Sequence, residues 1–283
     1  MKVNNSKVHA GAIVKSYRYG NTLELTTSNG IHKQTIKVLP NKKYVVLETG
    51  EVFDMDTSGM TRSDNIKSTR ITMRKLRRLI SHNFNGNKNE LWITLTYAKY
   101  TNEIEIVYRD FKLFIRDLRK QYSDLEYINV IEPQASGSWH CHLLIKAPKR
   151  SSLYIPNKII EECWKKGFTK TKRLKNSDKV GNYVVAYLTN LEIDDNQNTK
   201  KYVKGARLYL YPKGVRIYRC SRGIKKPIEI TATKGEVMTI NGLDIDLDAN
   251  YSKKTNHIIS TGDEISYITE FYNIGDKNED SES

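Results

Sequence analysis

The sequence predicts an α+β fold, with a central antiparallel sheet that carries helices on one face and with a small β region at the N-terminus. Helical and extended segments follow one another in the order β-α-β-β-α through the middle of the chain. Two of the extended segments are joined by a short turn, which requires antiparallel pairing. The chain has 283 residues, of which 38% are hydrophobic, so it can bury a sizeable core while much of it stays hydrated. Helices on one face would leave the other face open to a substrate.

The first 60 residues are predicted to form the small β region. Residues 11–54 contain short stretches in which apolar and polar side chains alternate, and Gly, Asn and Pro interrupt these stretches. The pattern indicates short strands separated by turns. Residues 55–65 (MDTSGMTRSDN) have the composition of a linker. A first domain is therefore expected over residues 1–60.

Residues 61–228 are predicted to form the main domain. It begins with a basic amphipathic helix over residues 66–84, and its first strand is LWITLTY (91–97), whose continuous apolar character is typical of a sheet centre. The other elements follow from apolar residues at helical or alternating spacing and from Pro156 as a first helical residue. They are a helix over 107–122, strands over 127–132 and 139–146, a helix over 156–165, an exposed basic segment over 167–175, a helix over 180–190 and a hairpin over 207–221.

Charge divides the chain unevenly. The 47 Lys and Arg residues exceed the 32 Asp and Glu residues by 15, yet residues 229–283 hold twelve acidic and four basic side chains. Residues 1–228 therefore carry a net charge of +23, and residues 229–283 are expected to be an acidic C-terminal tail that is dispensable for chemistry. A strongly basic body is typical of a protein that binds a polyanion, and tyrosines interleaved with Lys and Arg suit stacking on single-stranded bases. The alternative is a basic surface that serves only solubility.

Other features of the sequence exclude several classes of protein. No run of eighteen apolar residues is present, so no transmembrane helix is expected. The N-terminal residues lack the apolar core of a secretion signal. Three cysteines without a Cys-x-x-Cys pair do not form a disulfide framework or a cysteine zinc site. We therefore expect a cytoplasmic protein.

The segment WHCHL (139–143) is the most specific chemical signal. Side chains alternate between the two faces of a strand, so His140 and His142 are predicted to point to one face and Cys141 to the other. A six-residue turn folds the preceding strand back and brings its last residue, Glu132, beside His140. Two imidazoles and a carboxylate on one side of an ion leave the other side open to water or substrate. The sequence thus predicts a metal site, whereas the alternative interpretation is a pair of ordinary surface histidines.

Tyr183 and Tyr187 provide the second signal. A spacing of four residues places both phenols on one face of the predicted helix, one turn apart. Tyrosine can attack a phosphodiester and form a covalent phosphotyrosine when a metal polarises the phosphate. Two aromatic side chains packed on an amphipathic helix are the alternative interpretation.

Taken together, these signals resemble a known family. The strand that ends in Leu-Thr-Tyr (95–97), Glu132 with the WHCHLLI segment, and YVVAYLTN (183–190) resemble the three ordered motifs of HUH endonucleases. More narrowly, they are similar to the rolling-circle replication initiator (Rep) proteins of bacterial plasmids and phages. The resemblance spans residues 65–227 approximately, and it implies that residues 61–228 form an HUH endonuclease domain. It also implies that Mg²⁺ or Mn²⁺ positions the scissile phosphate of single-stranded DNA on the sheet.

The resemblance further implies a role for each site residue. The two histidines and Glu132 correspond to the metal ligands of the family. Tyr187 corresponds to the nucleophile, and Tyr183 to a second tyrosine that some initiators use. Asn190 stands where the family usually has a lysine, so a neutral hydrogen-bond donor replaces a charge next to the phosphate.

The function implied by this resemblance is the initiation of rolling-circle replication. The protein is expected to nick and rejoin single-stranded origin DNA at a specific sequence through a 5′-phosphotyrosine intermediate, leaving a free 3′-OH that can prime synthesis. The chain has no Walker A motif, so a host helicase and a DNA polymerase are the expected partners, together with the origin DNA and without a membrane. A conjugative relaxase and an HUH transposase are alternative enzymes. An origin-binding protein with a decayed site is the non-enzymatic alternative.

Overall fold

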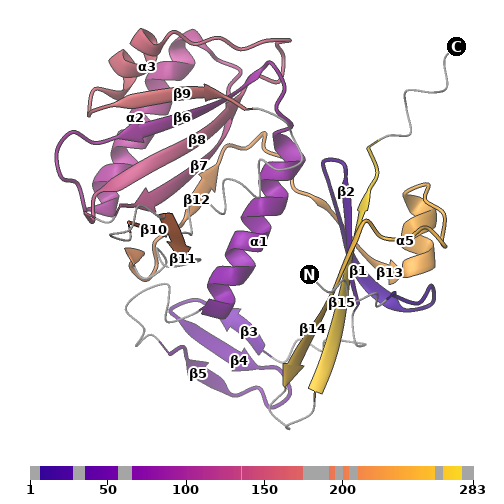
Figure 1. Cartoon of the computed structure of the whole chain (residues 1–283). Helices are drawn as coiled ribbons and strands as arrows, with labels where there is room; N and C mark the ends of the chain where they lie inside the picture. The colour runs from indigo at the N-terminus through magenta and orange to yellow at the C-terminus, as the bar shows by residue number, and fades with distance from the viewer. Residues whose placement is uncertain are drawn as a thin grey trace, which may run out of the picture. The chain divides into compact units, whose positions relative to one another are not determined.

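The computed structural model of the chain confirms the α+β class. The structure is described for residues 7–27, 36–56, 66–134, 136–174, 191–194, 200–203, 210–258 and 264–275. In these ranges it contains four helices, and every strand pairing is antiparallel. The chain divides into two compact units, one of residues 59–226 and one that combines residues 1–58 with residues 227–283 (Figure 1). No helix among the described residues is long and apolar enough to cross a membrane.

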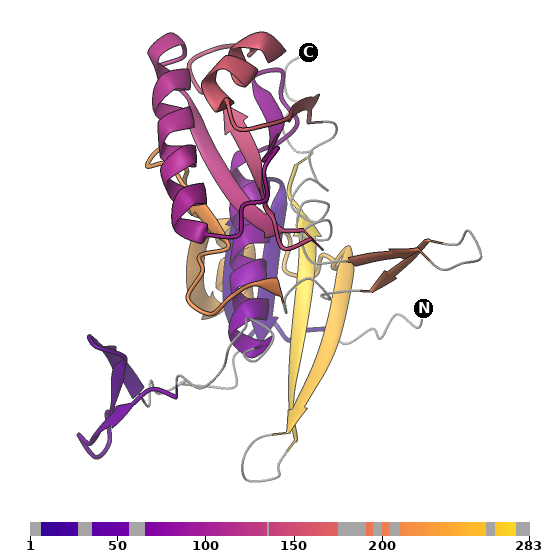
Figure 2. The ribbon, with the colours of Figure 1, turned by 90° about the vertical axis from the view of Figure 1, so that its left-hand side faces the viewer.

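A five-stranded sheet forms the centre of the unit of residues 59–226, and its strand order is β12-β7-β8-β6-β9. These strands are β6 (Glu90–Thr96), β7 (Glu126–Pro133), β8 (Trp139–Lys146), β9 (Thr169–Arg173) and β12 (Tyr218–Cys220). The helices are α1 (Ile66–Asn83), α2 (Ile104–Gln121) and α3 (Asn157–Trp164), and β10 (Leu191–Asp194) pairs with β11 (Lys200–Val203) in a separate hairpin. The views in Figures 1 and 2 both place α2 against one face of the sheet.

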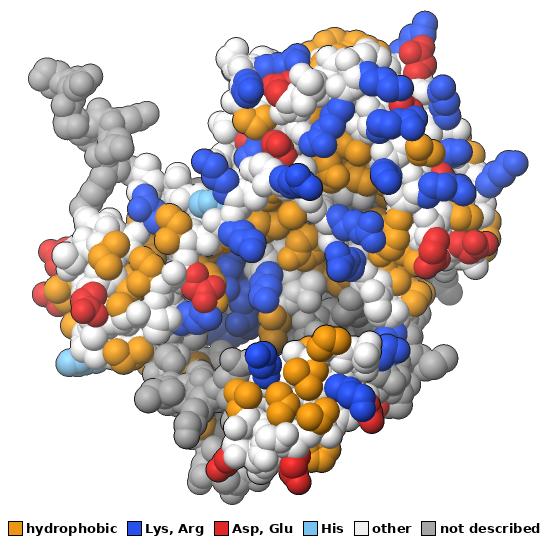
Figure 3. All heavy atoms as spheres, turned by 180° about the vertical axis from the view of Figure 1, so that it is seen from behind, with side chains coloured by type: hydrophobic (Ala, Val, Ile, Leu, Met, Phe, Trp, Pro, Cys, Tyr) orange, Lys and Arg blue, Asp and Glu red, His pale blue; other side chains and the backbone are white. Residues whose placement is uncertain are grey.

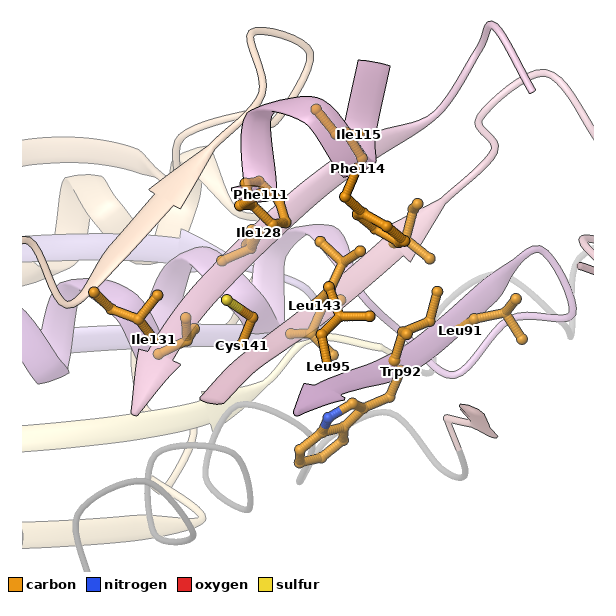
Figure 4. Close-up of a cluster of buried hydrophobic side chains, with 14 of the residues drawn as sticks. Leu91, Trp92, Leu95, Phe111, Phe114, Ile115, Ile128, Ile131, Cys141 and Leu143 are labelled. Carbon is orange, nitrogen blue, oxygen red and sulfur yellow. The ribbon is translucent and has the colours of Figure 1, made fainter. Parts of the chain in front are cut away.

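The core lies between the sheet and α2. Phe111 and Phe114 of α2 are buried, and they point toward the side chains of Cys141 and Leu143 on β8 (Figure 4). Trp92 of β6 points to the opposite side of the sheet in the same view. The alternation predicted for β8 is therefore confirmed for Cys141, and its burial raises the pKa of the Cys141 thiol to about 12. The face that carries the histidines is the one away from α2.

Most predicted elements of this unit are confirmed within a few residues. The strand predicted over 139–146 is β8, and the helix predicted over 107–122 is α2, which begins three residues earlier. The basic segment over 167–175 contains β9. The hairpin predicted over 207–221 lies partly outside the described residues, and its described strand, β12, pairs with β7. The helix predicted over 180–190 lies wholly outside the described residues.

The other unit combines strands from both ends of the chain. One sheet has the order β13-β1-β2-β15-β14, and another has the order β3-β4-β5. The N-terminal strands are β1 (Ile13–Tyr19), β2 (Thr22–Thr27), β3 (Ile36–Leu39), β4 (Lys43–Val46) and β5 (Val52–Asp54), as the alternation over 11–54 predicted. The C-terminal elements are β13 (Ile228–Thr233), α5 (Lys234–Ile240), β14 (Tyr251–Ile258) and β15 (Glu264–Asn273).

The expectation of an acidic tail over residues 229–283 was wrong for most of this segment. β13 pairs with β1 along six residues, and β15 pairs with β2. Val237 and Met238 of α5 are fully buried in the apolar core of this unit. The segment is thinly apolar because only one face of its strands is covered, and its pairing partners lie more than 200 residues away in the sequence.

Candidate metal and nucleic-acid site

The candidate site lies on the sheet face away from α2, at the end where β8 begins. Residues that lie directly opposite each other on paired strands share a face of the sheet. The register places Glu132 of β7 and Thr96 of β6 on either side of His140. The next row across the sheet contains Val130, His142 and Thr94. The predicted hairpin therefore places the carboxylate opposite His140, as its turn length indicated.

His142 and Glu132 form the buried part of the site. The side chains are 2% and 1% exposed, and Nε2 of His142 lies 2.5 Å from a carboxylate oxygen of Glu132. The ring of His142 also packs edge-on against Trp92, and its Nδ1 lies 3.4 Å from the hydroxyl of Thr94. Burial lowers the pKa of His142 to about 4, so at neutral pH the ring is uncharged and its Nε2–H donates to the carboxylate.

His140 is the accessible part of the site. Its ring centroid lies 6.2 Å from that of His142, and its side chain is partly exposed. Burial, together with the neighbouring His142, lowers the pKa of His140 to about 4. Its Nε2 is a buried atom with no hydrogen-bond partner among the described residues. An uncharged imidazole with an unpartnered nitrogen is the form of histidine that binds a metal.

The donor set suits a divalent ion in its chemistry, although the three groups do not yet surround one point. Two imidazoles and one carboxylate can bind Mn²⁺ or Mg²⁺ on one side. Neighbouring ligands around octahedral Mg²⁺, each at about 2.1 Å, lie about 3 Å apart, so the 2.5 Å contact of His142 with Glu132 is a hydrogen bond. In the described part of the chain, no group of three His, Cys, Asp or Glu side chains is closely enough gathered to hold a metal. Binding would have to replace the proton of this contact.

The predicted nucleophiles cannot be placed on this face. Tyr183, Tyr187 and Asn190 all lie outside the described residues. Their assigned roles therefore remain predictions from the sequence. Tyr97, which follows β6, is an unsuitable nucleophile because burial raises its pKa above the usual value near 10.

Sequence reasoning did not assign a role to β9, which is the edge strand next to β6. Lys170 lies opposite Thr94 and Lys172 lies opposite Trp92, so both lysines share the face that carries His142. Phe168 directly precedes β9, and its carbonyl accepts a hydrogen bond from the amide of Thr96. The alternation Phe-Thr-Lys-Thr-Lys over 168–172 was the available signal, because it indicates a strand with a basic face.

Positive charge is concentrated in the unit that carries the site. Residues 59–226 contain 35 Lys and Arg and 15 Asp and Glu, a net charge of +20, whereas the rest of the chain has 12 and 17, a net charge of −5. The view from behind shows that Lys and Arg side chains also cover the surface away from the site (Figure 3). Some of these are paired, such as Arg116 and Lys120 of α2 with Asp117. Charge therefore identifies the unit that binds a polyanion but does not select one face of it.

Comparison with known proteins supports a role in DNA replication. A family of replication-associated proteins, described by the name ORF2, matches residues 90–192, just over a third of the chain. The matched residues run from β6 through the WHCHL segment to β10, and they include both predicted tyrosines. No curated protein and no solved structure matches the chain significantly. The match supports a replication initiator protein.

Proposed function

We propose that the protein initiates rolling-circle replication by nicking and rejoining single-stranded origin DNA through a covalent phosphotyrosine. The observation that carries this proposal is the row of His140, Glu132 and the neighbouring His142 on the sheet face opposite α2. The similarity to replication-associated proteins supports it, because the matched range contains this row together with the segment of Tyr183 and Tyr187. The fold supplies a sheet with one face free of α2.

The two histidines and Glu132 would hold Mg²⁺ or Mn²⁺, which withdraws charge from a phosphate oxygen and so favours nucleophilic attack. The Tyr187 hydroxyl would attack the phosphorus, form an O–P bond and lose its proton, while the 3′ oxygen of the preceding nucleotide leaves. A free 3′-OH and a 5′-phosphotyrosine result. Asn190 would donate a hydrogen bond to a phosphate oxygen. The 3′-OH could then prime synthesis or attack the phosphotyrosine to rejoin the strand.

A covalent-adduct experiment tests this proposal. The full-length protein is incubated with Mn²⁺ and single-stranded DNA from its own replicon, labelled at the 5′ or the 3′ end. We expect an adduct on a denaturing gel that carries only the 3′-labelled fragment, because the tyrosine retains the 5′ phosphate. Mass spectrometry of the linked peptide should identify Tyr187.

Tyrosine variants provide the controls. Tyr187→Phe keeps the ring and removes the attacking oxygen, so the first cleavage should disappear. Tyr183→Phe should retain the first cleavage and impair the second transfer. Tyr154→Phe, at an exposed loop position beyond the other end of the strands, should behave as the wild type. An adduct that survives in the Tyr183→Phe/Tyr187→Phe double variant would end the tyrosine mechanism, and one mapped to Tyr183 in the wild type would reverse the assignment.

One observation favours a second candidate, an origin-binding protein without nuclease activity. The described residues hold no ready cluster of three metal ligands, and His142 is engaged with Glu132. Such a protein would bind origin DNA in a salt-dependent manner and form no adduct with any divalent ion. The adduct experiment therefore separates the two functions.

A further inference from the structure

The edge of the sheet beside the candidate metal site presents an exposed aromatic ring. Thr96 lies opposite His140, and the amide of Thr96 donates a 2.8 Å hydrogen bond to the carbonyl of Phe168. This bond extends the β6–β9 register by one position, so Phe168, Thr96, His140 and Glu132 occupy one row across four neighbouring chain segments. Two strand spacings, about 10 Å, separate Phe168 from His140.

Exposure of this ring is unusual for a phenylalanine. Phe168 is 76% exposed, more than any other large hydrophobic side chain among the described residues. A water-exposed ring at a sheet edge contributes no core packing, and edge strands usually avoid apolar side chains. The position is also structurally specified, because a Cβ at Gly167 would collide with the backbone of Thr96 and Ala98. Glycine lets the segment approach β6 closely at this point and places the next residue, Phe168, at the edge.

Positive charge continues from this ring along β9. Lys170 and Lys172 are exposed and follow Phe168 on the same face, at alternate positions. Neither lysine forms an ion pair with any described residue, in contrast to Arg116 and Lys120 on α2. An aromatic ring followed by unpaired cations matches the chemistry of a single nucleic-acid strand, which has stackable bases and a charged backbone.

We propose that Phe168 is a base-stacking platform and that Lys170 and Lys172 contact the backbone of the same single strand as it leaves the metal site along β9. The proposal rests on the proposed function, because it takes the strand to be the one that presents its phosphate to His140. It makes Phe168 a positioning residue. Paired bases in a duplex do not offer their faces to a side chain, so this contact selects single-stranded DNA.

Binding measured in chelator tests the proposal without any cleavage. The probes are single-stranded oligo(dT) carrying one 2-aminopurine and the same strand paired with its complement. Phe168→Ala should weaken binding of the single strand about 5- to 150-fold, the range for losing one base–aromatic stack, and leave duplex binding unchanged. It should also abolish the quenching of 2-aminopurine fluorescence, whereas Phe168→Trp should retain both properties. The salt dependence of binding should not change, because the ring is uncharged.

Tyr154→Ala is the matched control. Tyr154 is 73% exposed, and its neighbour Leu153 bonds to Lys88, just before the opposite end of β6. If Phe168→Ala binds the single strand as tightly as Tyr154→Ala does, or weakens duplex binding equally, the stacking proposal is wrong. A wild-type protein that forms no covalent adduct but still shows the Phe168 effect would refute nicking and leave the stacking intact. An adduct without a Phe168 effect would show the reverse.

Discussion

At the scale of single residues, the two histidines differ more than their sequence pattern indicates. His142 is buried and donates to Glu132, whereas the Nε2 of His140 has no partner among the described residues. Removal of His142 would leave the Glu132 carboxylate buried, which costs about 1–3 kcal/mol or more for an unpaired acceptor. Removal of His140 breaks no such hydrogen bond. His140 is therefore the cleaner position at which to test the metal site.

We predict that His140→Ala lowers the nicking rate by about 100-fold or more, the scale of losing an electrostatic contact to the transition state. The free energy of unfolding and the affinity for single-stranded DNA should stay close to those of the wild type, because Lys and Arg supply the affinity. Nicking, urea unfolding and filter binding measure the three quantities. Excess chelator should reproduce the loss of nicking in the wild type.

The control for this variant is His9→Ala, at an exposed position in the other unit. Nicking that persists at the wild-type rate in His140→Ala, or in chelator, would remove the metal site. His142→Ala should lose nicking and stability together. This double loss is the reason that His142 alone cannot decide the question.

At the scale of elements, the sequence predicted what local periodicity determines. β8 was predicted with its observed bounds, and α1 was predicted to within one residue, because apolar residues repeat strongly in both. The opposition of Glu132 and His140 followed from the turn length. The hydrogen bond from His142 to Glu132 could not be predicted, because it depends on side-chain conformations that the spacing does not fix.

Pairing between distant segments was not predictable from one sequence. Val8 donates its amide to Glu270, 262 residues away, and no local pattern reports such a contact. The start of α5 was readable, however. Thr233 and Glu236 form a reciprocal capping box, and the pattern Thr-x-x-Glu is its sequence signature. Composition alone suggested a tail, because acidic residues dominate the segment.

The buried ion pair of Lys234 and Glu270 is predicted to hold the two ends of the chain together. The charged groups lie 3.0 Å apart and are about 1% and 2% exposed, and Glu270 also accepts from Val8 and Tyr272. Glu270→Gln keeps the size of the side chain but leaves the Lys234 ammonium buried without its counter-charge. Breaking such a pair costs about 3–5 kcal/mol. Native-state hydrogen exchange of the β1 and β2 amides should report this loss.

An exposed ion pair in the same sheet gives the comparison. Lys15 and Glu229 are about half exposed, so Glu229→Gln should cost less than about 1 kcal/mol. The double variant Lys234→Met/Glu270→Leu should recover part of the stability lost in Glu270→Gln, because it removes both charges. Equal protection in Glu270→Gln and Glu229→Gln would contradict the assigned role.

At the scale of the whole molecule, charge separates the two units. Residues 59–226 carry +20 and the remaining residues carry −5, although their strands are similarly polar. A polyanion is attracted to the first unit and weakly repelled by the second. The discontinuous unit is thus suited to a task other than non-specific DNA binding, and the affinity for DNA should reside in residues 59–226.

Salt dependence tests this division of charge. Each backbone phosphate neutralised on a single strand contributes about 0.7 to the slope of log K against log salt concentration. Lys170→Gln/Lys172→Gln should therefore reduce the slope for oligo(dT) by about 1.4. Lys253→Gln/Lys254→Gln removes two exposed lysines from β14 in the negatively charged unit, and it should leave the slope unchanged. Titrations of the full-length variants over a range of salt concentrations measure both slopes. If the two double variants reduce the slope equally, DNA contacts both units and the affinity is not confined to residues 59–226. If only the β14 variant reduces it, the single strand does not follow β9, and the path inferred from Phe168 is wrong as well.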